Sequence, residues 1–183
     1  MWEICLYLWL PCIYFMKTLL SADAFKLTVN RLAHQLTEDE KSLQNLVFIG
    51  IQPRGTFISD KIMEQIERST GEKPCYGKLD ITFYRDDVRQ ELHAPNQTII
   101  PFSIEGKTVV FIDDVLYTGR TIRAALDALM DFGRPSAVKL CVLINRKYNR
   151  ELPIQPDYTG ITINTKKEEK VKINPSTGEA ILY

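Results

Sequence analysis

The stretch that decides the fold is residues 109–121, which read VVFIDDVLYTGRT. Thr108 to Ile112 form an apolar run typical of a strand that is buried on both faces of a sheet. Two carboxylates, Asp113 and Asp114, follow directly, and the residues through Thr121 are expected to form a polar turn. The pattern therefore predicts an acidic pair at the carboxyl end of a strand, where open α/β sheets bind ligands.

The same order of strand, loop and helix occurs again earlier in the chain. Leu46 to Ile51 is a continuous apolar run, Gln52-Pro53-Arg54-Gly55 is a loop, and a helical apolar pattern then runs through Ile58, Ile62 and Ile66 to Gly71. Alternating strands and helices predict an α/β fold with a mostly parallel sheet flanked by helices. The other expected elements are a helix from Ser21 to Leu36 with Ser21 as N-cap, a strand at Gly77–Phe83, a helix at Ile122–Phe132 ended by Gly133, a strand at Val138–Ile144, and short segments at Tyr158–Ile163 and Lys170–Ile173 that cap the sheet edge.

Composition excludes several classes of protein. The 183 residues carry 23 basic and 23 acidic side chains, so any binding of nucleic acid requires a local basic patch. None of the four cysteines forms a C-x-x-C pair, and only two histidines occur, which argues against a disulfide scaffold, a zinc finger and a histidine-based triad. We therefore expect any metal to be a hard cation bound by carboxylates and substrate oxygens.

The first fifteen residues differ from the rest. Residues 1–15 read MWEICLYLWLPCIYF and contain a single charge, Glu3. The apolar run is shorter than the roughly 20 residues that span a bilayer and contains Pro11, so we predict no membrane partner and a cytoplasmic protein. An arm that packs on a partner remains open, but we interpret residues 1–15 as an extension outside the fold and residues 16–183 as one domain.

The turn at residues 118–121 has the chemistry of an anion site. Thr118-Gly119-Arg120-Thr121 leads into a helix, so backbone N–H groups, two hydroxyls and a guanidinium can converge on one phosphate. Taken alone, Asp113-Asp114 is better interpreted as a helix cap and first-turn acid on the surface. The complete pattern of apolar strand, acidic pair and T-G-x-T turn favours a ligand site.

Residues 110–121 resemble the phosphoribosyl-pyrophosphate signature of the type I phosphoribosyltransferases. The resemblance implies that the paired acids engage the ribose hydroxyls, that the T-G-x-T turn holds the 5-phosphate, and that a C-terminal segment forms a small hood. The loop after the first core strand would hold pyrophosphate. The residues implied to bind phosphoribosyl pyrophosphate are Pro53, Arg54, Gly55, Asp113, Asp114, Val115, Leu116, Tyr117, Thr118, Gly119, Arg120 and Thr121.

Further blocks are similar to the members of this family that are uracil phosphoribosyltransferases and pyrimidine-operon regulators. The resemblance implies the reaction of uracil with phosphoribosyl pyrophosphate to give UMP and pyrophosphate. Asp113, Asp114, Arg54 and Arg85 would be the catalytic residues, and Mg²⁺ would be held by the substrate and by the two aspartates. An arm from Tyr84 to Pro101 would cover the site. The blocks are Asp80–Asp87, Gly133–Ser136, Arg150–Ile154 and Asp157–Tyr158.

The same resemblance implies a base site and an RNA-binding face. Arg146 and the backbone near Val171 would recognise uracil, and the protein would be a homodimer or a larger homo-oligomer. A transferase for a purine base, or an RNA-binding regulator with vestigial catalysis, remain alternatives. Asn30 and Asn164-Thr165-Lys166 depart from the pattern and weaken the regulatory interpretation. The residues implied to contact pyrimidine operon leader mRNA are Arg31, His34, Arg146, Lys147 and Arg150, with Lys166 and Lys167 as possible extensions.

Overall fold

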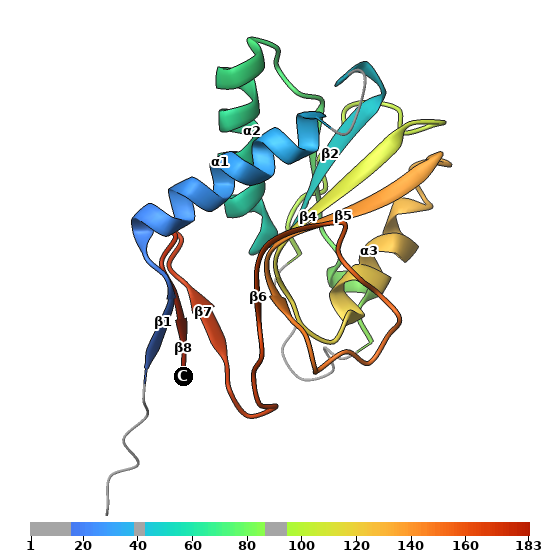
Figure 1. Cartoon of the computed structure of the whole chain (residues 1–183). Helices are drawn as coiled ribbons and strands as arrows, with labels where there is room; N and C mark the ends of the chain where they lie inside the picture. The colour runs from blue at the N-terminus through green and yellow to red at the C-terminus, as the bar shows by residue number, and fades with distance from the viewer. Residues whose placement is uncertain (1–15, 39–42, 87–94) are drawn as a thin grey trace, which may run out of the picture.

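The structure is a computed structural model that describes residues 16–38, 43–86 and 95–183. Its centre is a parallel sheet of five strands in the order β3-β2-β4-β5-β6 (Figure 1). The predicted α/β architecture with a mostly parallel sheet is confirmed. The predicted extension, residues 1–15, lies outside the described residues. The strands of this sheet are β2 (Leu46–Ile51), β3 (Tyr76–Leu79), β4 (Thr108–Leu116), β5 (Ala137–Arg146) and β6 (Tyr158–Ile163).

Helices cover both faces of this sheet (Figure 1). Alternate residues of β4 enter opposite layers, because successive side chains of a strand point to opposite faces. Val110 and Ile112 pack in one cluster with α1 (Ala22–Glu38) and α2 (Gly55–Thr70), whereas Val109 and Phe111 pack in another with α3 (Arg120–Leu129). The central strand is thus buried on both sides, and its carboxyl end is held rigidly.

The start of α1 and the end of α2 follow the predicted signals. The Ser21 hydroxyl accepts a hydrogen bond from the backbone N–H of Ala24 at 3.2 Å, which makes it the cap of α1. Gly71 ends α2 in the left-handed conformation, with φ of 73°, and its N–H donates to the carbonyl of Glu67. Both helices therefore begin or end where a residue suited to a terminus occurs.

Several boundaries differ from the sequence prediction. β4 continues to Leu116 because its ladder with β5 extends to the pair Leu116↔Asn145, so the acidic pair lies within the strand and not on a turn. β3 ends at Leu79, and a 3-10 turn, η2 (Thr82–Tyr84), replaces the predicted end of that strand. Another 3-10 turn, η1 (Leu43–Asn45), precedes β2.

α3 spans Arg120–Leu129, so the predicted start at Ile122 and the predicted stop at Gly133 are both wrong. The N–H groups of Asp131 and Phe132 donate three residues back, to Ala128 and Leu129, which ends the α-helical pattern before Gly133.

A second, antiparallel sheet forms the hood, with the order β1-β8-β7 (Figure 1). Its strands are β1 (Lys17–Leu20), β7 (Val171–Ile173) and β8 (Ala180–Leu182). The prediction of a hood from the C-terminal segment alone was incomplete, since β1 from the other end of the chain pairs with β8. β1 has four residues, which are too few to show the alternation of apolar and polar side chains typical of a strand, and its partner β8 is remote in sequence.

Candidate active site

A cavity of about 490 Å³ opens at the carboxyl ends of the central strands, beside the hood. An adjoining cavity of about 500 Å³ shares Arg54, Val171 and Tyr183 with it and adds Pro53 and Asp114. The structure therefore brings together predicted residues from the loop after β2, from β4 and its turn, and from the hood. The residues that line the first cavity are Arg54, Arg85, Asp113, Val115, Leu116, Tyr117, Thr118, Gly119, Arg120, Thr121, Arg146, Lys170, Val171 and Tyr183.

The phosphate turn, residues 118–121, leads from β4 into α3. Gly119 has φ of 96°, a conformation that other residues rarely adopt, and a Cβ there would lie 3.3 Å from Ile154. The Thr118 hydroxyl accepts from the backbone N–H of Arg120 at 3.4 Å. The N–H groups of the first helical turn have no partner within a helix, and the helix dipole is positive at this end. The turn is therefore built to accept an anion.

The side chain of Arg120 is already engaged. Its Nε donates to Glu151 at 2.8 Å, and its Nη1 lies 3.5 Å from Asp86 at the start of the predicted arm. The backbone N–H groups of Glu151 and Leu152 donate to the carbonyl of Thr118 at 3.0 and 3.2 Å. The guanidinium of Arg120 would therefore be shared between a phosphate and two carboxylates, and the Arg120 N–H would exchange its long contact with Thr118 for a phosphate oxygen.

The acidic pair, Asp113 and Asp114, is buried, each residue being 5% exposed. Asp113 accepts from the N–H of Asp114 at 2.9 Å, and Asp114 accepts from the N–H of Val115 at 2.7 Å. Arg54 lies 3.4 Å from the other oxygen of Asp114. Burial, reinforced by the neighbouring charge of Asp114, raises the pKa of Asp113 well above its ordinary value. Asp113 is therefore harder to ionise than an exposed aspartate.

The loop after β2 approaches the acidic pair closely. Gln52 and Pro53 are joined by a cis peptide bond. A Cβ at Gly55 would lie 2.6 Å from the carbonyl oxygen of Ile112, so only glycine lets the start of α2 pack against β4 here. Arg54 remains exposed, with 73% of its side chain accessible, and lines both cavities.

Arg146 connects the main sheet to the hood. Its guanidinium lies 3.9 Å from the centre of the Tyr117 ring and donates to the Thr165 hydroxyl at 2.8 Å. It also donates to the carbonyls of Lys166 and Glu169 at 3.0 and 2.9 Å. The buried side chain thus holds residues 165–169, directly before the hood strand β7.

The model of the phosphoribosyl transferase domain matches residues 16–175. The chain belongs to the phosphoribosyl transferase family. This match confirms the predicted family and the transferase class. Two curated relatives are both called "Bifunctional protein PyrR". The one from Picosynechococcus is 49% identical over 85% of this chain and 88% of its own length, and the one from Elusimicrobium minutum is 46% identical over 86% and 88%.

Solved structures show the same fold at lower identity. A hypoxanthine-guanine phosphoribosyltransferase from Bacillus anthracis has a TM-score of 0.63 at 19% identity, with 81% of this chain and 83% of that one covered. A hypoxanthine phosphoribosyltransferase from Staphylococcus aureus has a TM-score of 0.62 at 21% identity, with 81% and 77% covered. The architecture of this phosphoribosyltransferase is therefore the one that the resemblance implied.

The cations predicted to bind RNA are used in different ways in this phosphoribosyltransferase. Arg31 donates to the carbonyls of Thr159 and Gly160 in β6, and Arg150 donates to Asn145 at 2.7 Å and to the carbonyl of Tyr117. Arg146 is 5% exposed. Of the five main residues of the set, His34 and Lys147 are the exposed side chains for which the structure shows no hydrogen bond among the described residues, and the same holds for the extensions Lys166 and Lys167.

Two residues that line the cavity of this phosphoribosyltransferase were missed from the sequence. Lys170 and Tyr183 exchange backbone hydrogen bonds of 2.7 and 3.0 Å at the edge of the hood. Their positions depend on the pairing of β7 with β8, and no local pattern indicates that pairing.

Among the described helices, none is long and apolar enough to cross a bilayer.

Proposed function

We propose that this phosphoribosyltransferase acts on uracil and phosphoribosyl pyrophosphate to give UMP and pyrophosphate, and that it also binds pyrimidine operon leader mRNA in response to UMP. The observation that carries the proposal is the single cavity lined by Asp113, the phosphate turn, Arg54 and the hood. The identity of almost half with relatives called bifunctional proteins, over 85% of the chain, supports a second activity beside the transfer.

The cavity suits a sugar that carries a phosphate on its fifth carbon and a pyrophosphate on its first carbon. The 5-phosphate would accept hydrogen bonds from the phosphate turn, residues 118–121, at the start of α3. The ribose hydroxyls would donate to the carboxylates of Asp113 and Asp114, which hold the sugar over the end of β4. Arg54 and Arg85, which both line the cavity, would then lie beside the pyrophosphate.

The reaction requires charge stabilisation more than a nucleophilic side chain. The bond from the sugar's first carbon to pyrophosphate breaks, and both electrons leave with pyrophosphate. N1 of uracil forms the new bond to that carbon, and its proton passes to the departing pyrophosphate or to water. Positive charge grows on the sugar in the transition state, where the acidic pair stabilises it, and negative charge grows on the leaving group, where Arg54 and Arg85 neutralise it.

The donor set fits a magnesium ion that is shared with the substrate. Carboxylate oxygens are suitable ligands for Mg²⁺. Asp113 lines the first cavity and Asp114 lines the adjoining one, which shares Arg54 with it. Within residues 16–38, 43–86 and 95–183, no group of three or more His, Cys, Asp or Glu side chains could hold a metal ion. We therefore propose that phosphoribosyl pyrophosphate supplies most ligands. When bound, the ion would supply positive charge to the pyrophosphate.

Base recognition is proposed at the hood. Arg146 holds residues 165–169, so the backbone of Lys170 and Val171 is presented to the cavity in a fixed position. Backbone donors and acceptors that match the edge of uracil leave unpaired groups when another base binds, which gives selectivity. The role of Arg146 is then to position the hood as well as to line the base site.

Three further features belong to the proposal. Residues 1–15 would lie outside the catalytic domain, and the start of the family match at residue 16 supports this. The family resemblance also supports a homo-oligomer and a location in the cytoplasm.

The decisive experiment is a panel of bases with phosphoribosyl pyrophosphate and Mg²⁺. The purified protein should convert uracil to UMP at least roughly a hundredfold faster than it converts hypoxanthine or guanine, since a site that pairs the edge of one base rejects others by large factors. Formation of IMP or GMP at a higher rate than UMP would contradict the proposed substrate. Titration with labelled pyrimidine operon leader mRNA, with and without UMP, tests the second activity, and affinity that UMP leaves unchanged would contradict it.

A further inference from the structure

Gln52 and Asp80 stand side by side at the edge of the sheet that carries the cavity. They follow β2 and β3, whose parallel register pairs Ile51 with Leu79. The backbone N–H of Gln52 donates to the carbonyl of Leu79 at 2.9 Å, so the two chains are still joined where the strands end. Neither side chain lines the cavity, and the reaction described above uses neither of them.

Asp80 connects the segment that follows β3, at Thr82, with the segment at Asn96 and Thr98. Its buried carboxylate accepts from the backbone N–H of Thr82 at 2.9 Å and from the backbone N–H and side-chain amide of Asn96 at 3.1 and 3.4 Å. Its own N–H donates to the hydroxyl of Thr98 at 3.1 Å. Burial alone would raise the pKa of Asp80, but the hydrogen bonds from Thr82 and Asn96 outweigh it and hold that pKa below its ordinary value.

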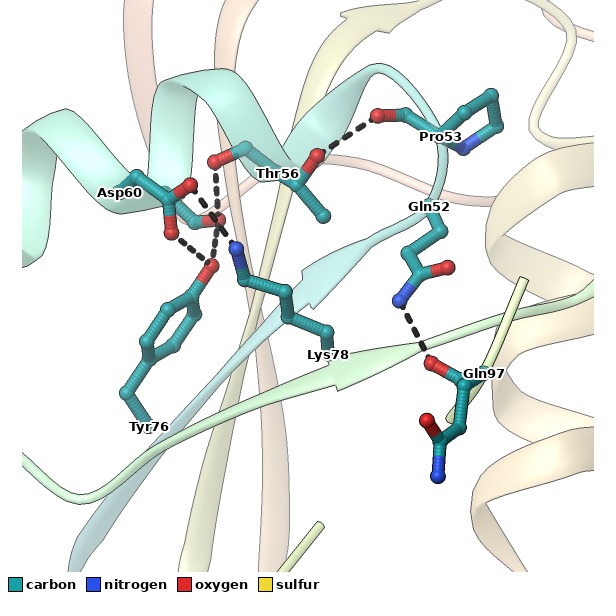
Figure 2. Close-up of polar contacts among 8 residues, drawn as sticks. Gln52, Pro53, Thr56, Asp60, Tyr76, Lys78 and Gln97 are labelled. Atoms are coloured by element: carbon teal, nitrogen blue, oxygen red, sulfur yellow. Dashed lines mark hydrogen bonds and ion pairs between the residues drawn. The ribbon is translucent and has the colours of Figure 1, made fainter. Parts of the chain in front are cut away.

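Gln52 connects the segment at Gln97 to the loop that carries Arg54. Its side-chain amide donates to the carbonyl of Gln97 at 3.0 Å (Figure 2). Its side-chain oxygen is buried and has no hydrogen-bond partner among the described residues. Rotating the amide would place this oxygen against the Gln97 carbonyl, so the observed orientation is the one that the contact requires.

A buried amide with an unpaired oxygen is a poor choice for stability. An apolar side chain of similar size would fill the position without leaving a polar atom unpaired. Within the part of the chain that the structure describes, the Gln52 side chain makes one hydrogen bond, the one to Gln97. Gln52 is therefore better explained by what that bond aligns than by a contribution to the folded state.

We propose that the neck clamp, defined as Gln52, Asp80, Asn96, Gln97 and Thr98, positions Arg54 and Arg85 relative to each other for pyrophosphate departure. Arg54 is two residues beyond Gln52, and Arg85 directly follows η2, whose start is held by Asp80. Both arginines line the cavity but come from different loops, so a link between those loops sets their separation. Gln52 and Asp80 act through these arginines and are positioning residues. The inference rests on the proposed function.

The test compares Gln52→Leu and Asp80→Asn with two control variants. Asp60→Asn is the control for Asp80, because Asp60 accepts from Tyr76 and Lys78 at 2.8 and 2.9 Å on the side of β3 that faces α2, and does not line the cavity (Figure 2). Gln65→Leu on α2 is the control for Gln52 and lies outside the cavity as well.

Gln52→Leu should lower kcat by about tenfold and Asp80→Asn by tenfold to about a hundredfold, because a misplacement of roughly 1 Å can cost this much. The KM for pyrophosphate in the reverse reaction should rise and the KM for uracil should not. The melting temperature of Gln52→Leu should be unchanged or higher. Both controls should keep wild-type kinetics.

Two results would overturn the clamp. One is wild-type kcat and pyrophosphate KM in Gln52→Leu. The other is a loss of activity that follows the melting temperature across all variants, which a purely structural role predicts. If Asp80→Asn fails to fold, Thr98→Val removes only the bond to the Asp80 N–H and should show the same KM pattern more weakly.

Amide exchange separates failure of this inference from failure of the proposed function. Thr82 and Asn96 donate to different oxygens of Asp80, and asparagine keeps only one of them. In Asp80→Asn, the N–H of one of these two residues should therefore exchange at least about tenfold faster than in the wild type, with no substrate present. If the wild type forms no nucleotide from any base, the proposed function is wrong. Unchanged exchange at Thr82 and Asn96 would overturn the clamp in that case too.

Discussion

The cavity residues 113–121 and the set of cations predicted to bind RNA differ in how the structure uses them. In the first region, a contiguous motif places its residues around one cavity. In the second, Arg31 holds β6, Arg146 holds the hood and Arg150 holds the turn after β4. A motif that is local in sequence constrains its own geometry, whereas scattered arginines are available for internal hydrogen bonds wherever carbonyls lack partners.

The largest expected effect is a loss of catalytic activity from a substitution within residues 113–121. Asp114→Asn should reduce kcat/KM for UMP formation by roughly a hundredfold or more, because an electrostatic group aimed at the developing charge is lost. The fold should be retained, since an amide can still accept from the N–H of Val115. Steady-state kinetics with circular dichroism measures both. Asp127→Asn, an exposed carboxylate on α3, is the control, and near-normal turnover of Asp114→Asn would contradict the ribose role.

The next expected effect is a dependence of stability on pH at Asp113. Burial and the charge of Asp114 raise its pKa, so the folded state binds a proton that the unfolded state has released. Its contribution is present below the ordinary value of 3.8 and is lost as the pH rises toward the raised value. Each unit of pKa corresponds to about 1.4 kcal/mol.

Asp113→Asn cannot titrate, so its stability relative to the wild type should increase as the pH rises above that ordinary value. Urea unfolding across a pH series measures the difference. A difference that stays constant with pH would show that Asp113 is ionised in the folded protein as easily as in the unfolded one. Activity should be lost in this variant even where it is the more stable protein.

Thr118→Val sharpens the phosphate assignment and should have a smaller effect. Removing one neutral hydroxyl from the phosphate turn should raise the KM for phosphoribosyl pyrophosphate by about tenfold, as expected for the loss of one hydrogen bond to a charged group. The KM for uracil should change little. Thr177→Val in the hood outside this cavity is the control. An unchanged affinity for phosphoribosyl pyrophosphate would place its phosphate elsewhere.

The smallest effect is expected at Lys147, on the other side of the comparison. Lys147→Ala should weaken binding of operon leader mRNA a few fold and lower the slope of log affinity against log salt by about one, as one phosphate contact does. UMP synthesis should not change. Because Lys147 is exposed, lost folding cannot explain the result. RNA affinity and salt slope equal to the wild type would remove Lys147 from the RNA-binding face.

The parts of the fold that sequence predicts are those with long, local patterns. The strand before Asp113, the Gly71 cap and the Ser21 cap each depend on neighbouring residues, and all three are found. The pairing of β1 with β8 depends on contacts between remote segments, which no local pattern encodes. The extension of β4 to Leu116 has the same cause, because the ladder with β5 decides where that strand ends.

In the candidate site, too, the residues of a local motif were predicted, and the residues placed by contacts between remote segments were not. Residues of the phosphate turn were identified because glycine, threonine and arginine occur together directly after an apolar strand. Lys170 and Tyr183 reach the cavity only through the hood, and the partners of Arg146 lie in a loop remote in sequence. Neither position could be placed without the tertiary structure.

The register of the hood has a practical consequence for anyone who makes this protein. Lys17 lies opposite Leu182, so the two ends of the described fold are neighbouring positions across one strand spacing, about 5 Å. Tyr183 follows at the mouth of the cavity. An affinity tag fused after Tyr183 would begin at the cavity, whereas a short linker from Tyr183 to Lys17 would close residues 17–183 into a ring, with new ends available in distant surface loops.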